Sequence, residues 1–390
     1  MSGASVSLGN VASIERIVVD PAEVSPDSLY IGLENIEKGG DIIGVGTVGQ
    51  AGLSSAKFKF TENHILFGKL RPYLAKIGRP EFEGICSTDI LPILPGPNLD
   101  RSYLAHFLRL PETIALATAR ATGANLPRVS PKEVASFEIP VPSLEEQRRI
   151  AEILDQADVL LAKRRKSAAL LDGLIRSVFF EMFGGSASGY QASTVGELAA
   201  DRKNSIRTGP FGSQLLHSEF VESGVPVLGI DNAVNNEFRW AKRRFITNEK
   251  YQKLARYRVF PGDVVITIMG TCGRCAVVPE DIGVAINTKH LCCISLDRNN
   301  CLPEFLHSYF LMHPIARSYL QRTAKGAIMS GLNMNIIKAM PVALPPLAHQ
   351  ERYVAVARRV QEQKLRQLGH LGHLEELFDS LQTRAFHGEL

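Results

Sequence analysis

The sequence lacks any long apolar run. No uninterrupted stretch of eighteen or more apolar residues occurs in the 390 residues, and the N-terminus does not resemble a signal peptide. We therefore expect a cytoplasmic protein with no membrane partner. Apolar residues make up 45% of the chain and charged residues 22%, as in ordinary globular domains. The chain is too long for one hydrophobic core, so two or three domains are expected.

The sequence also lacks the motifs of enzymes that act on DNA. It has no Asn-Pro-Pro-Tyr methyltransferase signature, no P-loop and no compact set of nuclease residues. Gly44–Gly49 matches the Gly-x-Gly-x-x-Gly dinucleotide fingerprint, but another glycine and no helical pattern follow it, which favours a turn between strands. We expect no catalysis and no cofactor; a nucleotide-binding enzyme using Gly44–Gly49 is one alternative.

Cysteine is scarce, with six residues, five of them in the second half of the chain. Cys272-x-x-Cys275 followed by Cys292-Cys293 is a pattern that zinc sites use. Adjacent cysteines are poor partners for one tetrahedral site, however, and both pairs lie in β-rich stretches. Free thiols are therefore the main expectation, and no metal is assigned.

The strongest periodic signal is a pair of heptad patterns. Between Leu144 and about Phe183, apolar residues recur in steps of three, four or seven, and Arg164 alone interrupts them. The same positions recur from Leu347 onward, with a polar Lys364 among them. Each pattern predicts a helix on the order of 60 Å long. On this assignment Leu161→Asp should cost several kcal/mol, and Lys364→Leu should be neutral or stabilising.

The chain also contains an internal repeat at a constant offset of 203 residues, which holds over some eighty residues without a gap. Before residue 100 the offset breaks down and the halves diverge. A duplicated scaffold with two divergent heads indicates one task performed on two different targets. The clearest matches are Phe107, Pro111, Pro142, Gln147 and Leu174, which fall on Phe310, Pro314, Pro345, Gln350 and Leu377.

These patterns predict an α+β fold, with two globular mixed α/β domains joined by two long antiparallel helices that form a coiled coil. Pro142 stops the preceding structure, and Ser143 is a plausible N-cap with Glu146 three residues on. The expected divisions are a first head at 1–141, a central helix at 142–184, a second head at 185–344 and a last helix at 345–390.

The order of heads, proline-rich junctions and Leu-x-x-Gln-x-Arg helices resembles the specificity subunit of type I restriction–modification systems. The resemblance covers essentially the whole chain. It rests on the order of the motifs and on the repeat, because no single motif is specific. The segments that carry it are Leu66–Tyr73, Pro142–Ile150, Gly209–Ser213, Pro261–Asp263 and Leu344–Arg352.

The resemblance implies that each head is a target-recognition domain that reads half of a split site in double-stranded DNA. It also implies that the paired helices dock methyltransferase subunits, two of them, and that motor-nuclease restriction subunits join the complex. The methyl donor would sit on those partners. Ala348-His349 stands where the first helix has Glu145-Glu146, which puts docking at that copy in question. A free-standing pseudo-dimeric DNA-binding regulator is the second alternative.

Charge supports a polyanionic partner, most clearly for the second head. Residues 184–344 hold 18 basic residues against 12 acidic ones, whereas residues 1–141 hold 13 against 15. Arg and Lys suit phosphates, and Arg, Lys, Gln, Ser and Thr suit base edges. The predicted DNA-binding residues of the first head are Lys69, Arg71, Tyr73, Lys76 and Arg79. Those of the second head are Arg207, Thr208, Ser213, Gln214, Lys242, Arg243, Arg244, Arg274, Lys289 and His290.

Overall fold

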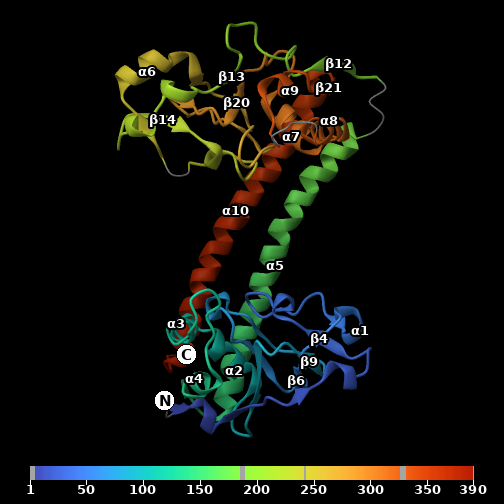
Figure 1. The fold of residues 1–390 in the computed structure, drawn as a ribbon, viewed down its shortest axis with the longest axis vertical. Coiled ribbons are helices and arrows are strands. Elements are labelled where there is room, and N and C mark those ends of the chain that lie inside the picture. Colours follow the sequence, from blue (N-terminus) through green and yellow to red (C-terminus); the bar gives the residue numbers. More distant parts are fainter. Residues whose placement is uncertain (1–4, 185–188, 241–242, 326–330, 390) are drawn as a thin grey trace. The chain divides into compact units, whose positions relative to one another are not determined.

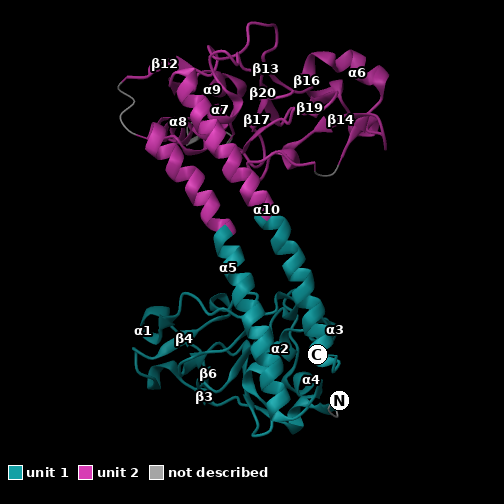
Figure 2. Ribbon diagram, turned by 180° about the vertical axis from the view of Figure 1, so that it is seen from behind, with its two compact units in different colours: residues 1–167, 367–390 teal, residues 168–366 magenta. Residues whose placement is uncertain are grey.

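The computed structural model describes residues 5–184, 189–240, 243–325 and 331–389. The chain divides into two compact units, coloured separately in Figure 2. Unit 1 comprises Met1–Ser167 and Gln367–Leu390, and unit 2 comprises Ala168–Arg366. Each unit contains a mixed α/β head and part of each of two long helices, α5 (Leu144–Phe183) and α10 (Leu347–Phe386) (Figure 1). The predicted α+β class, with two heads and two long helices, is confirmed.

The head of unit 1 contains a five-stranded, a four-stranded and a two-stranded sheet. In spatial order they are β3 (Val18–Val19), β6 (Lys57–Phe60), β9 (Gly84–Cys86), β4 (Leu29–Ile31) and β5 (Gly46–Thr47); β2 (Ala12–Ile14), β10 (Ile90–Pro95), β7 (Ile65–Gly68) and β8 (Ile77–Gly78); and β1 (Ser5–Ser7) with β11 (Glu138–Pro140). Its short helices are α1 (Val48–Ala51), α2 (Arg101–Arg109), α3 (Pro111–Ala119) and α4 (Pro131–Ala135).

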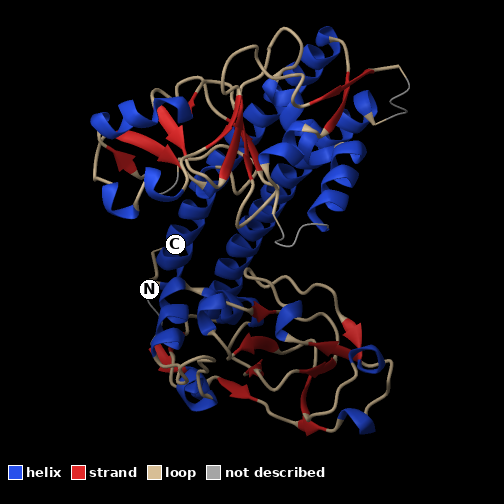
Figure 3. Cartoon of the chain, turned by 45° about the horizontal axis from the view of Figure 1, so that its top comes forward, coloured by secondary structure: helices blue, strands red, loops and turns tan. Residues whose placement is uncertain are grey.

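The head of unit 2 contains two four-stranded sheets and one two-stranded sheet (strands in red in Figure 3). They are β15 (Phe245–Ile246), β14 (Val225–Leu228), β19 (Ala285–Asn287) and β16 (Arg258–Val259); β13 (Ile206–Thr208), β20 (Leu291–Ile294), β17 (Val264–Thr267) and β18 (Cys275–Val277); and β12 (Gln191–Thr194) with β21 (Pro341–Leu344). Its helices are α6 (Asn248–Leu254), α7 (Pro303–Met312), α8 (Pro314–Lys325) and α9 (Met334–Lys338).

The two heads share one sheet topology, although their sequences diverge before residue 100. The sheets β2-β10-β7-β8 and β13-β20-β17-β18 have the same order and the same register. Ile14, Ile93 and Ile65 face one another across three strands of the first sheet, as Ile206, Ile294 and Val264 do across the second. The offset between equivalent residues is thus 192, 201 or 199, and no longer 203. Differences in loop length between the heads hide the repeat in the sequence.

Each head also contains a single parallel pair of strands among the described strand pairings. Tyr30 of β4 lies opposite Ile85 of β9, and Val227 of β14 lies opposite Ile286 of β19. The same turn follows the first strand of each pair. The backbone N–H of Gly32 donates to the side chain of Asn35 at 2.7 Å, and that of Gly229 donates to Asn232 at 2.9 Å.

The helices begin as predicted. The Ser143 hydroxyl accepts a hydrogen bond from the Glu146 backbone N–H at 3.3 Å, which caps α5. The repeated spacing Leu-x-x-Gln has a structural reason, because the glutamine of each copy is fully buried and ties its helix to its head. The Gln147 amide bonds Asp100 N–H and the carbonyls of Asn98 and Pro142. The Gln350 amide makes the matching bonds to Leu302 N–H and the carbonyls of Asn300 and Pro345.

The heptad stripes form the contact between α5 and α10 within each unit, and the two helices run antiparallel. In unit 1 the Arg165 guanidinium pairs with Glu375 at 2.7 Å, and in unit 2 Lys364 pairs with Asp172 at 2.8 Å. Leu161 is buried in the stripe. Lys364 also approaches Glu237 of the unit 2 head at 3.5 Å, so it is a bridging residue. This contact removes the basis for expecting Lys364→Leu to be neutral or stabilising.

Aromatic side chains fix the helix ends in the heads. In unit 1 the ring of Phe386 lies 4.7 Å from Tyr103 and 5.9 Å from Phe107, centroid to centroid. In unit 2 Phe183 lies 5.2 Å from Phe305 and 5.5 Å from Tyr353. Burying one such side chain contributes about 1.5–3 kcal/mol. Each head therefore requires an end of both long helices to complete its core.

Two sequence alternatives lose their structural context. Residues Gly44–Gly49 run through β5, which pairs antiparallel with β4, into a helix of four residues, so the parallel βαβ unit of a dinucleotide site is not formed there. The six cysteines are free thiols, five of them buried in the cores, and among the described residues no cysteine belongs to a group of three or more ligand atoms close enough to hold one metal ion. Burial raises the pKa of the Cys292 thiol to about 12. Among the described residues, none of the helices is long and apolar enough to cross a membrane.

Candidate nucleic-acid interface

Loops gather where the parallel strands of each head end. In unit 1 the ends of β4 and β9 lead into Gly32–Asn35 and Ser87–Asp89, and in unit 2 the ends of β14 and β19 lead into Gly229–Asn232 and residues 288–290. Parallel strands bring their carboxyl ends to one edge of a sheet, which is where such folds place binding sites. This edge was not identified from the sequence.

Two more loops join that edge in unit 1. In the β7–β8 connection, the Lys69 backbone N–H donates to the Asp89 carbonyl at 2.9 Å, and the Lys76 ammonium donates to the Leu33 carbonyl at 2.6 Å. The segment after α3 follows, since the Arg71 N–H donates to the Pro127 carbonyl at 2.8 Å. We call the four loops together the unit 1 rim; they are residues 32–35, 69–76, 87–89 and 122–128.

The unit 1 rim exposes side chains that soluble domains usually bury or pair. Tyr73 is 51% exposed, and Leu74 and Leu126 are also exposed, as is the guanidinium-bearing Arg71. Arg71 and Ala75 have φ angles of +51° and +49°, a left-handed conformation that non-glycine residues adopt at a cost of about 1–3 kcal/mol. Such strained residues cluster at functional sites. The rim therefore presents a rigid, partly apolar and basic surface.

One arginine of the unit 1 rim is held by a carboxylate. Nε and Nη2 of Arg128 donate to the two carboxylate oxygens of Asp89 at 2.8 and 3.1 Å, and Nη1 donates to the Leu126 carbonyl at 3.3 Å. The hydrogen bond with Asp89 raises the pKa of Arg128. The Arg128 side chain is still 41% exposed. Arg128 is thus a fixed cation open to an anionic or polar ligand.

The equivalent edge of unit 2, with the β17–β18 connection, forms the unit 2 rim: residues 229–232, 238–240, 243–244, 269–274 and 288–290. Here Nη2 of Arg244 donates to both oxygens of Asp231 at 3.1 and 3.0 Å. The pair lines a cavity of about 520 Å³ with apolar walls from Phe220 and Ile230. Thr288 and His290 also line it.

Two polar groups at this cavity are unusual. The Thr288 hydroxyl is buried without a hydrogen-bond partner. Burial, followed by the charges of Lys289 and Arg244, lowers the pKa of His290, which favours the neutral imidazole. The cavity therefore offers hydrogen-bonding groups without adding a second fixed charge. That combination suits the edge of a polar heterocycle.

Some of the other predicted residues of unit 2 are exposed, and others are held within the fold. Arg243 is exposed and its guanidinium lies 4.9 Å from the ring centroid of Trp240, while Arg274 and Ser213 are exposed on loops. Lys242 lies outside the described residues. Thr208 is half-buried at the end of β13.

Two predicted residues serve the fold instead. The guanidinium of Arg207 is 5% exposed and pairs with buried Asp263, so it does not reach the surface. Arg79 binds Asp155 of α5 through two hydrogen bonds of 3.0 and 2.7 Å. We do not retain Arg207 and Arg79 in the interface, because Arg207 is buried and Arg79 ties the head to α5. Gln214 is exposed, and only its amide oxygen is engaged, by the Phe211 N–H and the Tyr257 hydroxyl, so it stays a candidate.

Sequence reasoning missed three residues of the rims. They are Arg128, its partner Asp89, and Asp231, which is the partner of Arg244. Arg128 stands outside the basic stretch that ends at Arg79, and Asp89 lies 39 residues away from it in the chain. The available signal was the polar turn Ser87-Thr-Asp89 directly after a short strand.

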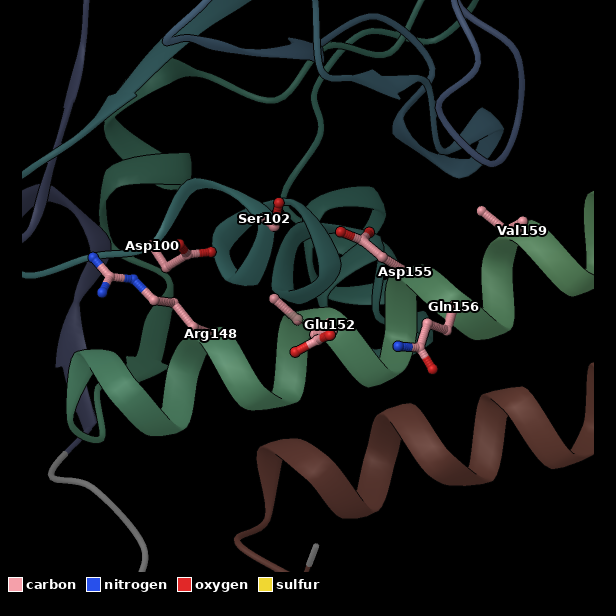
Figure 4. A pocket seen from close by; sticks show the side chains of 8 residues that line it. Asp100, Ser102, Arg148, Glu152, Asp155, Gln156 and Val159 are labelled. Carbon is pink, nitrogen blue, oxygen red and sulfur yellow. The ribbon is translucent and has the colours of Figure 1, made fainter.

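A second surface lies along the start of α5 in unit 1. It is a groove of about 630 Å³ between α2 and α5, shown in Figure 4. Arg148, Glu152 and Gln156 line it from the helix, and Asp100 and Ser102 line it from the head. Val159, which is 52% exposed, ends this lining. The groove therefore combines charged and polar side chains with apolar surface that includes Ala151 and Val159.

Comparisons with known proteins agree on one family. The model of the type I restriction modification DNA specificity domain matches residues 30–170 and 210–366. The chain is 27% identical over 180 residues to the type I restriction enzyme EcoDI specificity subunit of Escherichia coli, covering 45% of this chain and 40% of that protein. It is 24% identical over 274 residues to the MjaVIII specificity subunit of Methanocaldococcus jannaschii, covering 67% and 63%. The matches thus span about two fifths to two thirds of these relatives.

Solved structures share the fold. A chain solved in work on complex assembly and conformational transition of the type I R-M system superposes with a TM-score of 0.61 at 21% identity, covering 100% of this chain and 98% of that one. The type I restriction-modification S subunit from M. genitalium superposes with a TM-score of 0.59 at 14% identity, covering 98% and 96%.

Proposed function

Because the chain belongs to the type I restriction modification DNA specificity family, we propose that it is the sequence-recognition subunit of such a complex. Each head reads one half of a bipartite site in double-stranded DNA. The observation that carries the proposal is the recurrence of one loop edge in both heads with different side chains on it. A common frame with different contacts is what two different half-sites require.

The rims have the composition of DNA-reading surfaces. Arg71, Arg128, Arg244 and Arg274 offer charged donors for phosphates or base edges, and Tyr73 offers an exposed aromatic ring. Of the predicted residues we retain Lys69, Arg71, Tyr73, Lys76, Thr208, Ser213, Gln214, Lys242, Arg243, Arg244, Arg274, Lys289 and His290.

The partners in this proposal are methyltransferase subunits, two of them, and motor-nuclease restriction subunits. Methyl transfer and cleavage, with their cofactors, belong to those partners, and this chain contributes binding alone. Support comes from large apolar side chains that the long helices leave exposed, of which Val159 lines the groove of Figure 4. Those in unit 1 are Val159, Leu160, Leu368 and Leu377, and those in unit 2 are Leu170, Leu174, Phe180, Val356 and Leu365. We propose the divisions 1–141, 142–184, 185–344 and 345–390 as recognition and docking regions, in a cytoplasmic complex.

Methylation-sensitive sequencing of the host genome tests the proposal. We expect a split motif, with two specified parts and an unread gap, that disappears when this gene is deleted. Replacing residues 191–344 by the second head of another specificity subunit should change one part of the motif only. A motif that is unaffected by deletion would contradict the proposal. Failure to co-purify with any methyltransferase subunit would favour the free-standing regulator.

A further inference from the structure

A guanidinium can identify guanine when its orientation is fixed. The major-groove edge of guanine presents the O6 and N7 acceptors, and an arginine that donates to both distinguishes guanine from the other bases. A free arginine side chain has about 2 kcal/mol of rotamer entropy to lose. A carboxylate that binds one side of the guanidinium fixes the orientation of the remaining N–H donors before DNA binds. Each rim contains one arginine held in this way.

In unit 1 the held arginine is Arg128. Three of its five N–H groups are used, two by Asp89 and one by the Leu126 carbonyl. One hydrogen therefore remains on each terminal nitrogen. Two unused donors on neighbouring nitrogens match the pair of guanine acceptors.

In unit 2 the held arginine is Arg244. Its Nη2 donates to both oxygens of Asp231 at nearly equal distances, as a single hydrogen shared between two carboxylate oxygens does, and the described residues provide no partner for Nε or Nη1. The second Nη2 hydrogen and a hydrogen of Nη1 then leave one two-donor edge of the guanidinium for a base. The side chain is 35% exposed and lines the cavity that Thr288 and His290 share. The cavity supplies the space that a base edge would enter.

The two pairs are not copies of one inherited ion pair. Sheet register makes Asp89 equivalent to His290, and the shared Gly-x-x-Asn turn makes Asp231 equivalent to Glu34. In each head, therefore, the carboxylate that holds the arginine follows a different strand of the parallel pair. A structural ion pair kept from a common ancestor would occupy equivalent positions.

We propose that Arg128 and Arg244 each read a guanine in the half-site of their own head, with Asp89 and Asp231 as positioning residues. The inference rests on the proposed function. It adds that both half-sites contain a G·C pair read directly in the major groove.

The test uses the purified full-length chain, alone and with its methyltransferase subunits, and selection from a randomised duplex DNA library. Arg244→Lys keeps the charge but loses the fork, and should reduce guanine preference roughly ten- to hundred-fold at one position of one half-site. Arg128→Lys should do the same in the other half-site alone. Arg244→Gln and Arg128→Gln should shift those positions toward adenine, which glutamine reads.

Asp89→Asn and Asp231→Asn test positioning. Each should weaken the preference at the position its arginine reads, by less than the arginine variant, and leave the remaining positions unchanged. Matched controls are Arg120→Lys, paired with Glu133 in unit 1, and Arg298→Lys, paired with Glu280 in unit 2. These surface pairs lie outside the rims, so neither should alter any position.

Three outcomes decide the matter. Loss of preference at single positions in separate half-sites supports the inference. A uniform fall in affinity with unchanged preference would assign the arginines to phosphates and overturn it, and so would no effect at all. If the unaltered chain enriches no split sequence under either condition, the proposed function itself fails. Melting temperatures of the variants, expected to be unchanged, separate these results from misfolding.

Discussion

The two heads build the same sheet around matching polar pairs whose acidic members lie on different strands. At the start of β7, His64 accepts the Thr61 N–H and its other ring nitrogen lies 3.2 Å from Glu15. At the equivalent start of β17, Asp263 accepts the Phe260 N–H and binds Arg207. The acidic and basic members have exchanged strands. Both heads place a hydrogen-bonded pair at this point, but the fold does not specify which strand carries its acidic member.

The junctions between head and helix show the same reversal. In unit 1 an acidic residue of α5, Asp155, binds Arg79 and His106 of the head. At the equivalent place in α10, 203 residues on, Arg358 binds Glu304 of the unit 2 head. Each head is therefore matched to its own helix end. Single residues exchanged between the two units would place like charges together.

The comparison is sharpest at the buried pair of unit 2. Arg207 and Asp263 are 5% and 2% exposed, whereas Glu15 is 30% exposed. Arg207→Met leaves a buried carboxylate without its cation and should cost about 3–5 kcal/mol of unfolding free energy. Glu15→Gln should cost about 0.5–1.5 kcal/mol. Urea denaturation measures both. Arg298→Met, a surface control, should cost about 0–1 kcal/mol; equal losses for Arg207→Met and Glu15→Gln would contradict the comparison.

Where the units agree, matched variants should behave alike. Gln147→Met and Gln350→Met each remove a buried amide and leave one N–H and two carbonyls short of a partner. Each should cost about 2–3 kcal/mol. Thermal melting of the two single variants is the measurement. A loss in one unit only would show that the glutamines differ in role despite their matching bonds.

At the helix junctions the expected difference is smaller and depends on pH. Burial raises the pKa of Asp155, but hydrogen bonds and charge from His106 and Arg79 outweigh burial and hold it well below its usual range. The stabilisation is therefore complete above the unfolded pKa, about 4, and is lost as pH falls through the folded pKa.

Asp155→Asn should accordingly cost about 1–2 kcal/mol at neutral pH, with the one-third exposure of this side chain reducing the effect. The difference in unfolding free energy between this variant and the unaltered chain should narrow on acidification below about pH 4. Arg358→Gln, whose side chain is 66% exposed, should cost about 0–1 kcal/mol. Denaturant titrations at several pH values would measure these differences in unfolding free energy. A difference between Asp155→Asn and the unaltered chain that widens in acid would refute the assignment.

The smallest effect concerns the stripe between the helices. Leu161 and Lys364 are equivalent, yet Lys364 bridges Asp172 and Glu237. Burial lowers the pKa of Lys364, but these carboxylates outweigh burial and raise it overall. Its stabilisation is therefore present below the unfolded pKa, about 10.4, and is lost as pH rises through the folded pKa.

Lys364→Leu should then cost about 0.5–1 kcal/mol at neutral pH, and the difference should fade in strong alkali. Calorimetry would resolve this. Stabilisation by Lys364→Leu would restore the simpler view that the position prefers an apolar residue.

The sequence predicted the parts of the fold whose spacing is rigid. Helical periodicity located α5 and α10, because a helix allows no insertion without losing its stripe. The sheets were not matched between heads, because loop-length changes shift the offset from 203 to 201, 199 and 192 while strand register is kept. Strands of two to six residues carry too little pattern to reveal that equivalence.

The candidate site was predicted less well, for a different reason. Composition identifies Arg and Lys, but it does not distinguish Arg207, which is buried against a carboxylate 56 residues away, from exposed Arg71. That distinction depends on long-range partners. Arg128 was missed for the same reason, since Asp89 gives it an orientation that no local pattern encodes.

Unit 1 is assembled from separate stretches of chain, and this imposes an order on synthesis. Residues 168–366 of unit 2 are contiguous, whereas unit 1 needs residues 367–390 to follow. Until Phe386 emerges, the aromatic rings of Tyr103 and Phe107 lack the ring that covers them. With 223 residues between 167 and 390, ribosomes adding about 5–20 residues per second would leave this patch open for roughly 10–45 seconds. The core of the first head therefore stays partly uncovered while the ribosome completes the second head.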